Sequence, residues 1–112
     1  MTGNEYQHLA LRTAPPTNFP EEQLLQGLMG MCGEAGEAID LMKKHMFQSH
    51  ELDRIHMAKE IGDVLWYVSL AADSLGLTLE EIMQMNIDKL ASRYPNLVFE
   101  AERSLNRKEN DV

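Results

Sequence analysis

The sequence predicts an all-α protein, and three observations support that fold class. Apolar residues recur every three or four positions over long stretches, which places them on one face of a helix. No stretch alternates apolar and polar residues over a useful length, as a half-buried strand would. The prolines lie outside the long periodic segments, at Pro15, Pro16, Pro20 and Pro95. We therefore expect helices joined by short connections that proline marks.

The N-terminal third predicts one short helix and one long helix. The short helix is expected over about residues 4–13, before the turn-forming segment APPTNFP. The long helix is expected over about residues 18–46, because Asn18 and Glu21 form a capping-box pattern and Pro20 lies in the first turn. Its apolar stripe comprises Leu24, Leu25, Leu28, Met31, Cys32, Ala35, Ile39 and Met42.

Two further helices follow. The third is expected over about residues 52–75, where Gly76 stops it because glycine tolerates the left-handed conformation. Thr78 then starts a fourth helix and forms a second capping box with Glu81. Pro95 marks the end of this helix.

The length of 112 residues suits one domain and is too short for two. We expect a single domain over 1–112, with its core at about 18–95 and a mixed-charge tail at 96–112. The tail is expected to hold one helical turn at about 99–105. Three long helices and a short one predict a helical bundle, and oligomerisation would complete its core.

Charge and cysteine content narrow the class of protein. Lys and Arg number 10 against 18 Asp and Glu, a net charge of −8, so the surface should repel nucleic-acid polymers and anionic membranes. The lone Cys32 is expected to be a small core residue in a reducing compartment. Neither a signal peptide nor a spanning segment is apparent, which predicts a cytoplasmic protein.

The second and third helices each carry two acids three residues apart, Glu34 with Glu37 and Glu60 with Asp63. Each pair therefore shares a helix face. Asp63 is the one charged residue of the segment IGDVLWYVSLAA, so we expect it to be buried, and a buried unpaired carboxylate requires a cation. Four such carboxylates suit Mg²⁺, with Mn²⁺ as the second candidate. An isolated pair such as Glu34 and Glu37 is also common on an exposed helix face.

These acids also match a known signature. Glu34-x-x-Glu37, followed after 22 residues by Glu60-x-x-Asp63, resembles the signature of the MazG-like, all-α nucleotide pyrophosphohydrolases. Four segments resemble that family in the same order, namely GEAGEAIDLMKK, KEIGDVLWYV, LGLTLEEI and NIDKLASRYP. The resemblance implies a MazG-like four-helix core and an Mg²⁺-dependent enzyme. It would cleave a nucleoside triphosphate between the α- and β-phosphates into a monophosphate and pyrophosphate, as part of nucleotide-pool housekeeping.

The resemblance also implies roles for individual residues. The metal ligands would be Glu34, Glu37, Glu60 and Asp63. Glu34 or Glu37 would also orient the attacking water. The substrate-binding residues would be Lys44, Tyr67, Asn86, Lys89 and Arg93. The last three also share a helix face by their spacing, although a plain surface cluster has the same spacing. Relatives imply a homodimer or homotetramer, and the substrate is expected to be an ordinary dNTP, an oxidised one or dUTP.

Other interpretations remain open. A di-iron carboxylate bundle needs two Glu-x-x-His motifs, but Glu5 with His8 and Asp53 with His56 do not join the acid pairs. A non-catalytic helical interaction module would explain a stripe rich in methionine, of which the chain has eight, but leaves Asp63 unexplained. Four glycines recur every third residue in the second helix and favour close helix packing, namely Gly27, Gly30, Gly33 and Gly36. Trp66 is expected in the core, and the alternative is that Trp66 and Tyr67 line a base pocket next to Asp63.

Overall fold

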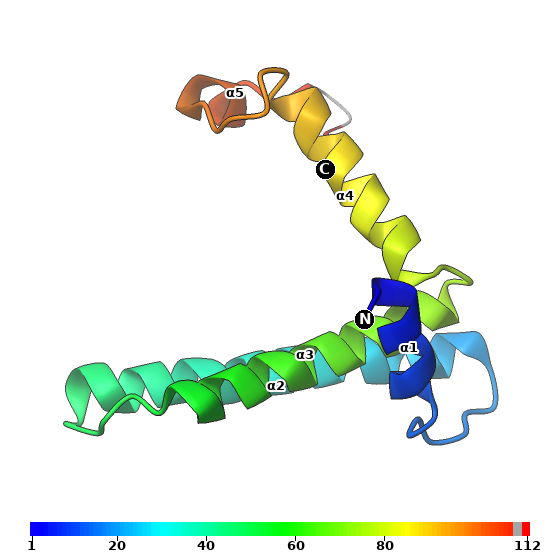
Figure 1. Ribbon diagram of the computed structural model, residues 1–112, viewed down its shortest axis with the longest axis vertical. Coiled ribbons are helices and arrows are strands. Elements are labelled where there is room, and N and C mark those ends of the chain that lie inside the picture. Colours follow the sequence, from blue (N-terminus) through cyan, green and yellow to red (C-terminus); the bar gives the residue numbers. More distant parts are fainter. Residues whose placement is uncertain (109–110) are drawn as a thin grey trace. The chain divides into compact units, whose positions relative to one another are not determined.

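The computed structural model describes residues 1–108 and 111–112, and within them the chain is helical with no strand. The elements are α1 (Gly3–Leu11), α2 (Pro20–Phe47), α3 (Arg54–Ser74), α4 (Leu79–Arg93) and α5 (Ala101–Leu105) (Figure 1). The all-α fold class is therefore confirmed. The chain forms two compact units, Met1–Leu79 and Glu80–Val112. In the described part, no helix is long and apolar enough to cross a membrane.

The start of α2 differs from the predicted capping box. Phe19, not Asn18, is the N-cap, and its side chain makes no capping hydrogen bond. Asn18 instead donates from Nδ2 to Glu22 Oε2 at 3.4 Å. The reason is that Pro20 occupies the first turn and holds Phe19 in the extended conformation, with φ −158° and ψ 158°. The prediction of a capping box between Asn18 and Glu21 is therefore wrong.

The ends of the other helices follow simple local rules. Thr2 caps α1 in a capping box with Glu5, and Asp53 caps α3 by accepting from the backbone N–H of His56 at 3.0 Å. Gly76 follows α3 with φ +72°, which confirms its predicted left-handed conformation. The helix α5 lies inside the turn expected at 99–105. The box between Thr78 and Glu81 stays a prediction.

The helices α2 and α3 lie antiparallel and side by side (Figure 1), and two glycines of α2 allow the close approach. A Cβ added at Gly27 would lie 2.9 Å from Ala71 Cβ and 3.1 Å from Ala71 Cα. A Cβ at Gly30 would overlap the ring of Tyr67. Gly33 and Gly36 meet nothing within 4 Å, so close helix packing explains only two of the four glycines.

A buried glutamine joins α1 to the C-terminal end of α3. Gln7 Nε2 donates to the carbonyl oxygens of Ser69 at 3.3 Å and Leu77 at 3.2 Å, and Gln7 Oε1 accepts from the N–H of Leu79 at 2.9 Å. Apolar residues surround this network. The buried apolar residues of the described chain are Ala10, Leu70, Ala71, Ala72 and Leu79. The core of the first unit is therefore small and lies where α1 and α2 pack on α3.

Trp66 provides a second connection between these helices. Its indole Nε1 donates to Ala10 O and to Thr13 Oγ1, both at 3.0 Å. Both partners belong to the C-terminal end of α1 and the turn after it. Trp66 therefore connects α3 to α1, but it is half-buried and not in the core as expected, because α1 and the turn after it cover only part of the indole.

Much of the apolar stripe of α2 is not covered. Cys32 is exposed, so its expected place in the core is wrong. Ile39 is also exposed, at 67%. The physical reason is that the stripe is wider than the surface that the single neighbouring helix α3 covers. Completion of the core by oligomerisation stays a prediction.

Candidate functional site

The predicted acids of α2 and α3 meet across the helix pair. Glu34 and Glu37 come from α2, and Glu60 comes from α3. One carboxylate oxygen from each of these residues lies within 4.8 Å of the other two. The antiparallel pairing that brings Gly30 against Tyr67 also places Glu60 opposite the two glutamates of α2. We call these three residues the acidic cluster.

The three carboxylates differ in burial. Glu60 is buried, Glu34 is half-buried and Glu37 is exposed. One oxygen of Glu60, Oε1, lies 3.0 Å from His56 Nε2, which donates to it from one turn earlier on α3. The other oxygen, Oε2, is buried without a hydrogen-bond partner, and so is Oε2 of Glu34. Two buried oxygens of the acidic cluster thus have no donor from the protein.

The proton affinities of the cluster reflect this shortage of donors. Burial, hydrogen bonding with Glu37 and the negative charges of nearby acids raise the pKa of Glu34 to about 7. Burial alone would raise the pKa of Glu60. Hydrogen bonding with its two glutamate neighbours and with His56 outweighs burial, and the pKa of Glu60 is therefore lower than its ordinary value. A single proton on Glu34 can therefore provide the missing donor. A cation would serve the same oxygens without a proton.

The fourth predicted ligand is placed differently. Asp63 is exposed, and its expected location among buried apolar side chains is wrong. The segment around it reads as apolar, yet Ile61 and Leu65 are exposed at 59% and 41%, because α2 covers only one side of α3. Asp63 lies near enough to raise the pKa of Glu34 through its charge. It follows Glu60 by three residues and so shares its helix face.

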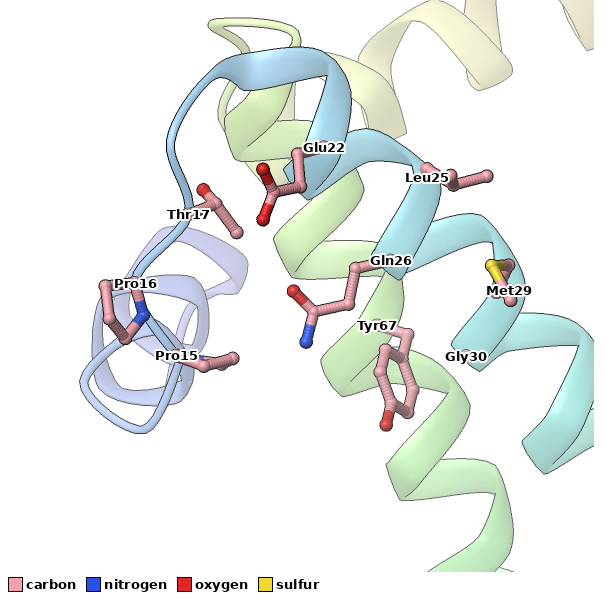
Figure 2. Close-up of a pocket in the computed structure, with 9 residues that line it drawn as sticks. All are labelled: Pro15, Pro16, Thr17, Glu22, Leu25, Gln26, Met29, Gly30 and Tyr67. Atoms are coloured by element: carbon pink, nitrogen blue, oxygen red, sulfur yellow. The ribbon is translucent and has the colours of Figure 1, made fainter.

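Two predicted substrate-binding residues lie on the same helix pair. Lys44 Nζ forms an ion pair with Asp40 at 3.0 Å, one turn earlier on α2. Tyr67 packs its ring over Gly30 and borders a pocket beside α2 (Figure 2). The ring of Trp66 meets that of Tyr67 edge to face, with centroids 4.9 Å apart. Tyr67 is therefore half-buried and held in place by packing.

The other three predicted substrate-binding residues lie on α4, in the second unit. Asn86 is exposed and Lys89 is half-buried. Arg93 is nearly buried and donates two hydrogen bonds to Asp111, from Nε at 2.7 Å and from the guanidinium NH2 at 2.8 Å. This pairing keeps the pKa of Asp111 below its ordinary value. Arg93 thus holds a carboxylate with the two-pronged geometry by which arginine also binds phosphate.

Sequence reasoning missed His56 as a neighbour of the cluster. Its signal was the spacing His56-x-x-x-Glu60, which places the imidazole one helical turn from the carboxylate. The spacing of Asp53 and His56 indicates instead one half of an iron-binding motif. Asp53 instead caps α3.

Comparison with known proteins identifies the family of the chain. The model of the MazG nucleotide pyrophosphohydrolase domain matches residues 19–98, which include the acidic cluster and Asp63. The Gene 37 protein of Mycobacterium phage L5 is 34% identical over 96 residues, which cover 79% of this chain and 84% of that protein. No solved structure matches the chain. The chain therefore belongs to the MazG nucleotide pyrophosphohydrolase family.

Proposed function

We propose that this protein hydrolyses a nucleoside triphosphate between its α- and β-phosphates and releases a nucleoside monophosphate and pyrophosphate. The proposed cofactor is Mg²⁺, with Mn²⁺ as an alternative, and its ligands are the acidic cluster together with Asp63. The observation that carries the proposal is the pair of buried oxygens, on Glu34 and Glu60, that have no donor from the protein. Buried polar atoms in proteins are nearly always paired, so this pair indicates a missing partner.

The donor set fits a hard divalent cation. All three clustered atoms are carboxylate oxygens, the ligand type that Mg²⁺ and Mn²⁺ prefer. Glu37 and Asp63 are exposed, which leaves the site accessible to water and phosphate oxygens. When bound, the ion would supply positive charge to the phosphates and to the departing pyrophosphate, and would acidify a nearby water.

The residues of the chain would then have distinct tasks. We assign the orientation of the attacking water to Glu34 or Glu37, whose carboxylate accepts its proton. His56 holds Glu60 through Oε1 and leaves the second oxygen of that carboxylate directed to the ligand. Phosphate binding is assigned to the basic and amide residues, namely Lys44, Asn86, Lys89 and Arg93. Arg93 would exchange the carboxylate of Asp111 for a phosphate.

We further propose that the protein acts as a homodimer or homotetramer on free nucleotides, not on nucleic-acid polymers. The exposed apolar stripe of α2 supports association, because such faces gain from being covered. The net charge of −8 supports a small substrate that is bound through a local cation.

The decisive experiment measures pyrophosphate release from ordinary nucleoside triphosphates, from oxidised ones and from dUTP, with and without Mg²⁺. We expect release only with the metal. Asp63→Asn should abolish it while circular dichroism stays unchanged. Glu51→Gln, at an exposed acid in the connection before α3, is the matched control and should keep full activity. Full activity of Asp63→Asn would remove this residue from the ligand set.

Pyrophosphate release, together with thermal melts with and without Mg²⁺, separates the enzyme from a non-catalytic helical module. A module would release no pyrophosphate from any nucleotide and would gain no thermal stability from Mg²⁺. The enzyme should show both effects.

A further inference from the structure

A pocket of about 610 Å³ borders α2 on the side of the loop that leads into this helix. Figure 2 shows its two sides: Pro15 and Pro16 on the loop, and the ring of Tyr67 on α3. Because Gly30 has no side chain, the ring of Tyr67 lies directly against its backbone. The pocket therefore has flat, mostly apolar walls with an aromatic ring among them, which suit a flat aromatic ligand.

Two polar side chains of α2 point into this space. Figure 2 shows the carboxamide of Gln26 and the carboxylate of Glu22 directed toward the loop at 15–17. The carboxamide of Gln26 has no hydrogen bond to any described residue, and the carboxylate of Glu22 accepts only a long one, from Asn18 Nδ2 at 3.4 Å. Glu22 and Gln26 are one helical turn apart, so both can reach one ligand.

Gln26 differs from two other glutamines of this unit, whose carboxamides are paired within the fold. Gln7 makes three hydrogen bonds to the backbone. Gln23, one turn from Gln26, donates to Leu70 O and to Asp73 Oδ2, both at 2.9 Å. These two glutamines hold helices together, whereas Gln26 faces the pocket with its donor and acceptor unused. Its position therefore fits recognition better than packing.

The pocket lies on the same helix pair as the acidic cluster. Gly30 precedes Glu34 by four residues on α2, and Tyr67 follows Asp63 by four residues on α3. Four residues of helix correspond to about 6 Å, roughly one turn. A nucleotide has a comparable layout, with one sugar between its base and its first phosphate. One ligand can thus reach both places.

We propose that this pocket holds the nucleobase of the substrate, and that Gln26 and Glu22 select a base with an exocyclic amino group beside a ring-nitrogen acceptor. Cytosine has this edge, and adenine shares it; uracil and thymine do not. The proposal rests on the proposed function, since it identifies the base of the same substrate.

The selection follows from donor and acceptor positions. The carboxamide of Gln26 donates to the ring nitrogen of cytosine and accepts from its amino group. The carboxylate of Glu22 accepts the second hydrogen of that amino group. Uracil presents a carbonyl oxygen at the same place, and this acceptor facing the carboxylate of Glu22, which can only accept, is unfavourable.

The first test needs neither metal nor turnover. Deoxycytidine and deoxyuridine are titrated into the metal-free protein, followed by the NMR signals of the Gln26 carboxamide and of Gly30. We expect deoxycytidine to bind about 10-fold more tightly than deoxyuridine, the size of effect that one base-reading pair gives. Equal binding of the two nucleosides, or shifts confined to other residues, would overturn the proposal.

Variants sharpen this test. Gln26→Leu should reduce the preference for deoxycytidine by about 10-fold, and Glu22→Gln should relax it by improving deoxyuridine binding. The matched control is Gln48→Leu, at an exposed glutamine that ends α2, which should change nothing. If Gln26→Leu loses helicity, Gln26→Glu keeps the shape, removes the donor and should lower deoxycytidine binding. An unchanged preference in both Gln26 variants would contradict the assignment.

The second test distinguishes this proposal from the proposed function. The ratio of kcat/KM for dCTP to that for dUTP is measured by pyrophosphate release, in the same variants. If no nucleotide is cleaved but the nucleoside preference holds, the proposed function fails and the base pocket stands. If both nucleotides are cleaved with a ratio that Gln26→Leu leaves unchanged, the base pocket fails and the proposed function stands.

Discussion

Two polar regions of the first unit have opposite hydrogen-bonding surroundings. Gln7 lies where α1 meets α3, and both ends of its carboxamide are hydrogen-bonded. Its amino group donates to two carbonyl oxygens, and its oxygen accepts from one N–H. The acidic cluster instead has two buried oxygens without a donor. Polar groups that organise the fold are satisfied by the chain itself. Unsatisfied like charges held together destabilise the fold, which is reasonable only if a ligand compensates them.

The strongest test of this contrast replaces a carboxylate of the cluster by its neutral isostere. Glu34→Gln should lower pyrophosphate release by about 100-fold or more, because a charged ligand is lost at the reacting site. The same change should raise the melting temperature of the metal-free protein, since it removes repulsion and adds a donor. It should also abolish the stabilisation by Mg²⁺. Activity assays and thermal melts with and without Mg²⁺ measure these effects.

The matched control for that variant is Glu21→Gln, at an exposed acid in the first turn of the same helix. It should leave activity and the Mg²⁺ effect unchanged. A metal-free Glu34→Gln protein that melts lower than the original would show that the carboxylate stabilises the fold. The contrast with Gln7 would then be lost.

The second prediction concerns the satisfied network. Gln7→Ala leaves the buried N–H of Leu79 without its partner and removes a donor from the carbonyl oxygens of Ser69 and Leu77, and should reduce the free energy of unfolding by about 2–3 kcal/mol. Urea unfolding measures this loss. The stabilisation by Mg²⁺ should stay as it was, because the network does not contact the acidic cluster. An altered Mg²⁺ response would mean that the two regions are coupled.

The third prediction compares two glycines of α2. Gly27→Ala should destabilise the protein by about 1–3 kcal/mol, because its Cβ would press on the backbone of Ala71. Gly33→Ala meets open space and should stabilise the helix by up to about 1 kcal/mol. Urea unfolding of both variants decides the point. Equal destabilisation by the two changes would contradict the observed helix contact.

The fourth prediction is the pH dependence of the acidic cluster. The pKa of Glu34 is raised to about 7, so the folded protein retains a proton that the unfolded chain releases near the ordinary value of 4.5. The stability of the metal-free protein should therefore fall as the pH rises from about 4.5 to 7.

The affinity for Mg²⁺ should change with pH in the opposite direction to the stability of the metal-free protein. Because Mg²⁺ must displace the proton, its affinity should increase by up to about 10-fold per pH unit below pH 7 and level off above it. Isothermal titration calorimetry at several pH values measures the trend. A pH-independent affinity between pH 5 and 7 would show that Glu34 is not a ligand. Glu34→Gln should flatten the profile.

Local rules in the sequence predicted the helices well. The stop at Gly76 and the lack of strands follow from glycine chemistry and from periodicity. The two pairs of acids were recognisable because three-residue spacing defines a shared face. The start of α2 was misjudged, because the effect of Pro20 on Phe19 outweighed the capping tendency of Asn18.

Burial was predicted less well, since it depends on what covers each face. Asp63 and Cys32 sit in apolar segments and were expected inside, yet both are exposed. Glu60, in a more polar segment, is the buried acid instead. Gln26 stood out only when the pocket beside it was seen (Figure 2).

The sequence alone determined which residues form helices and which acids share a face, because hydrogen bonds and side-chain spacing within a helix are local. Only the tertiary structure decided that Glu60 meets Glu34 and Glu37, and that two of their oxygens have no donor. The register of α2 against α3 depends on Gly27 and Gly30 fitting Ala71 and Tyr67, and such shape matching between distant segments has no local signature.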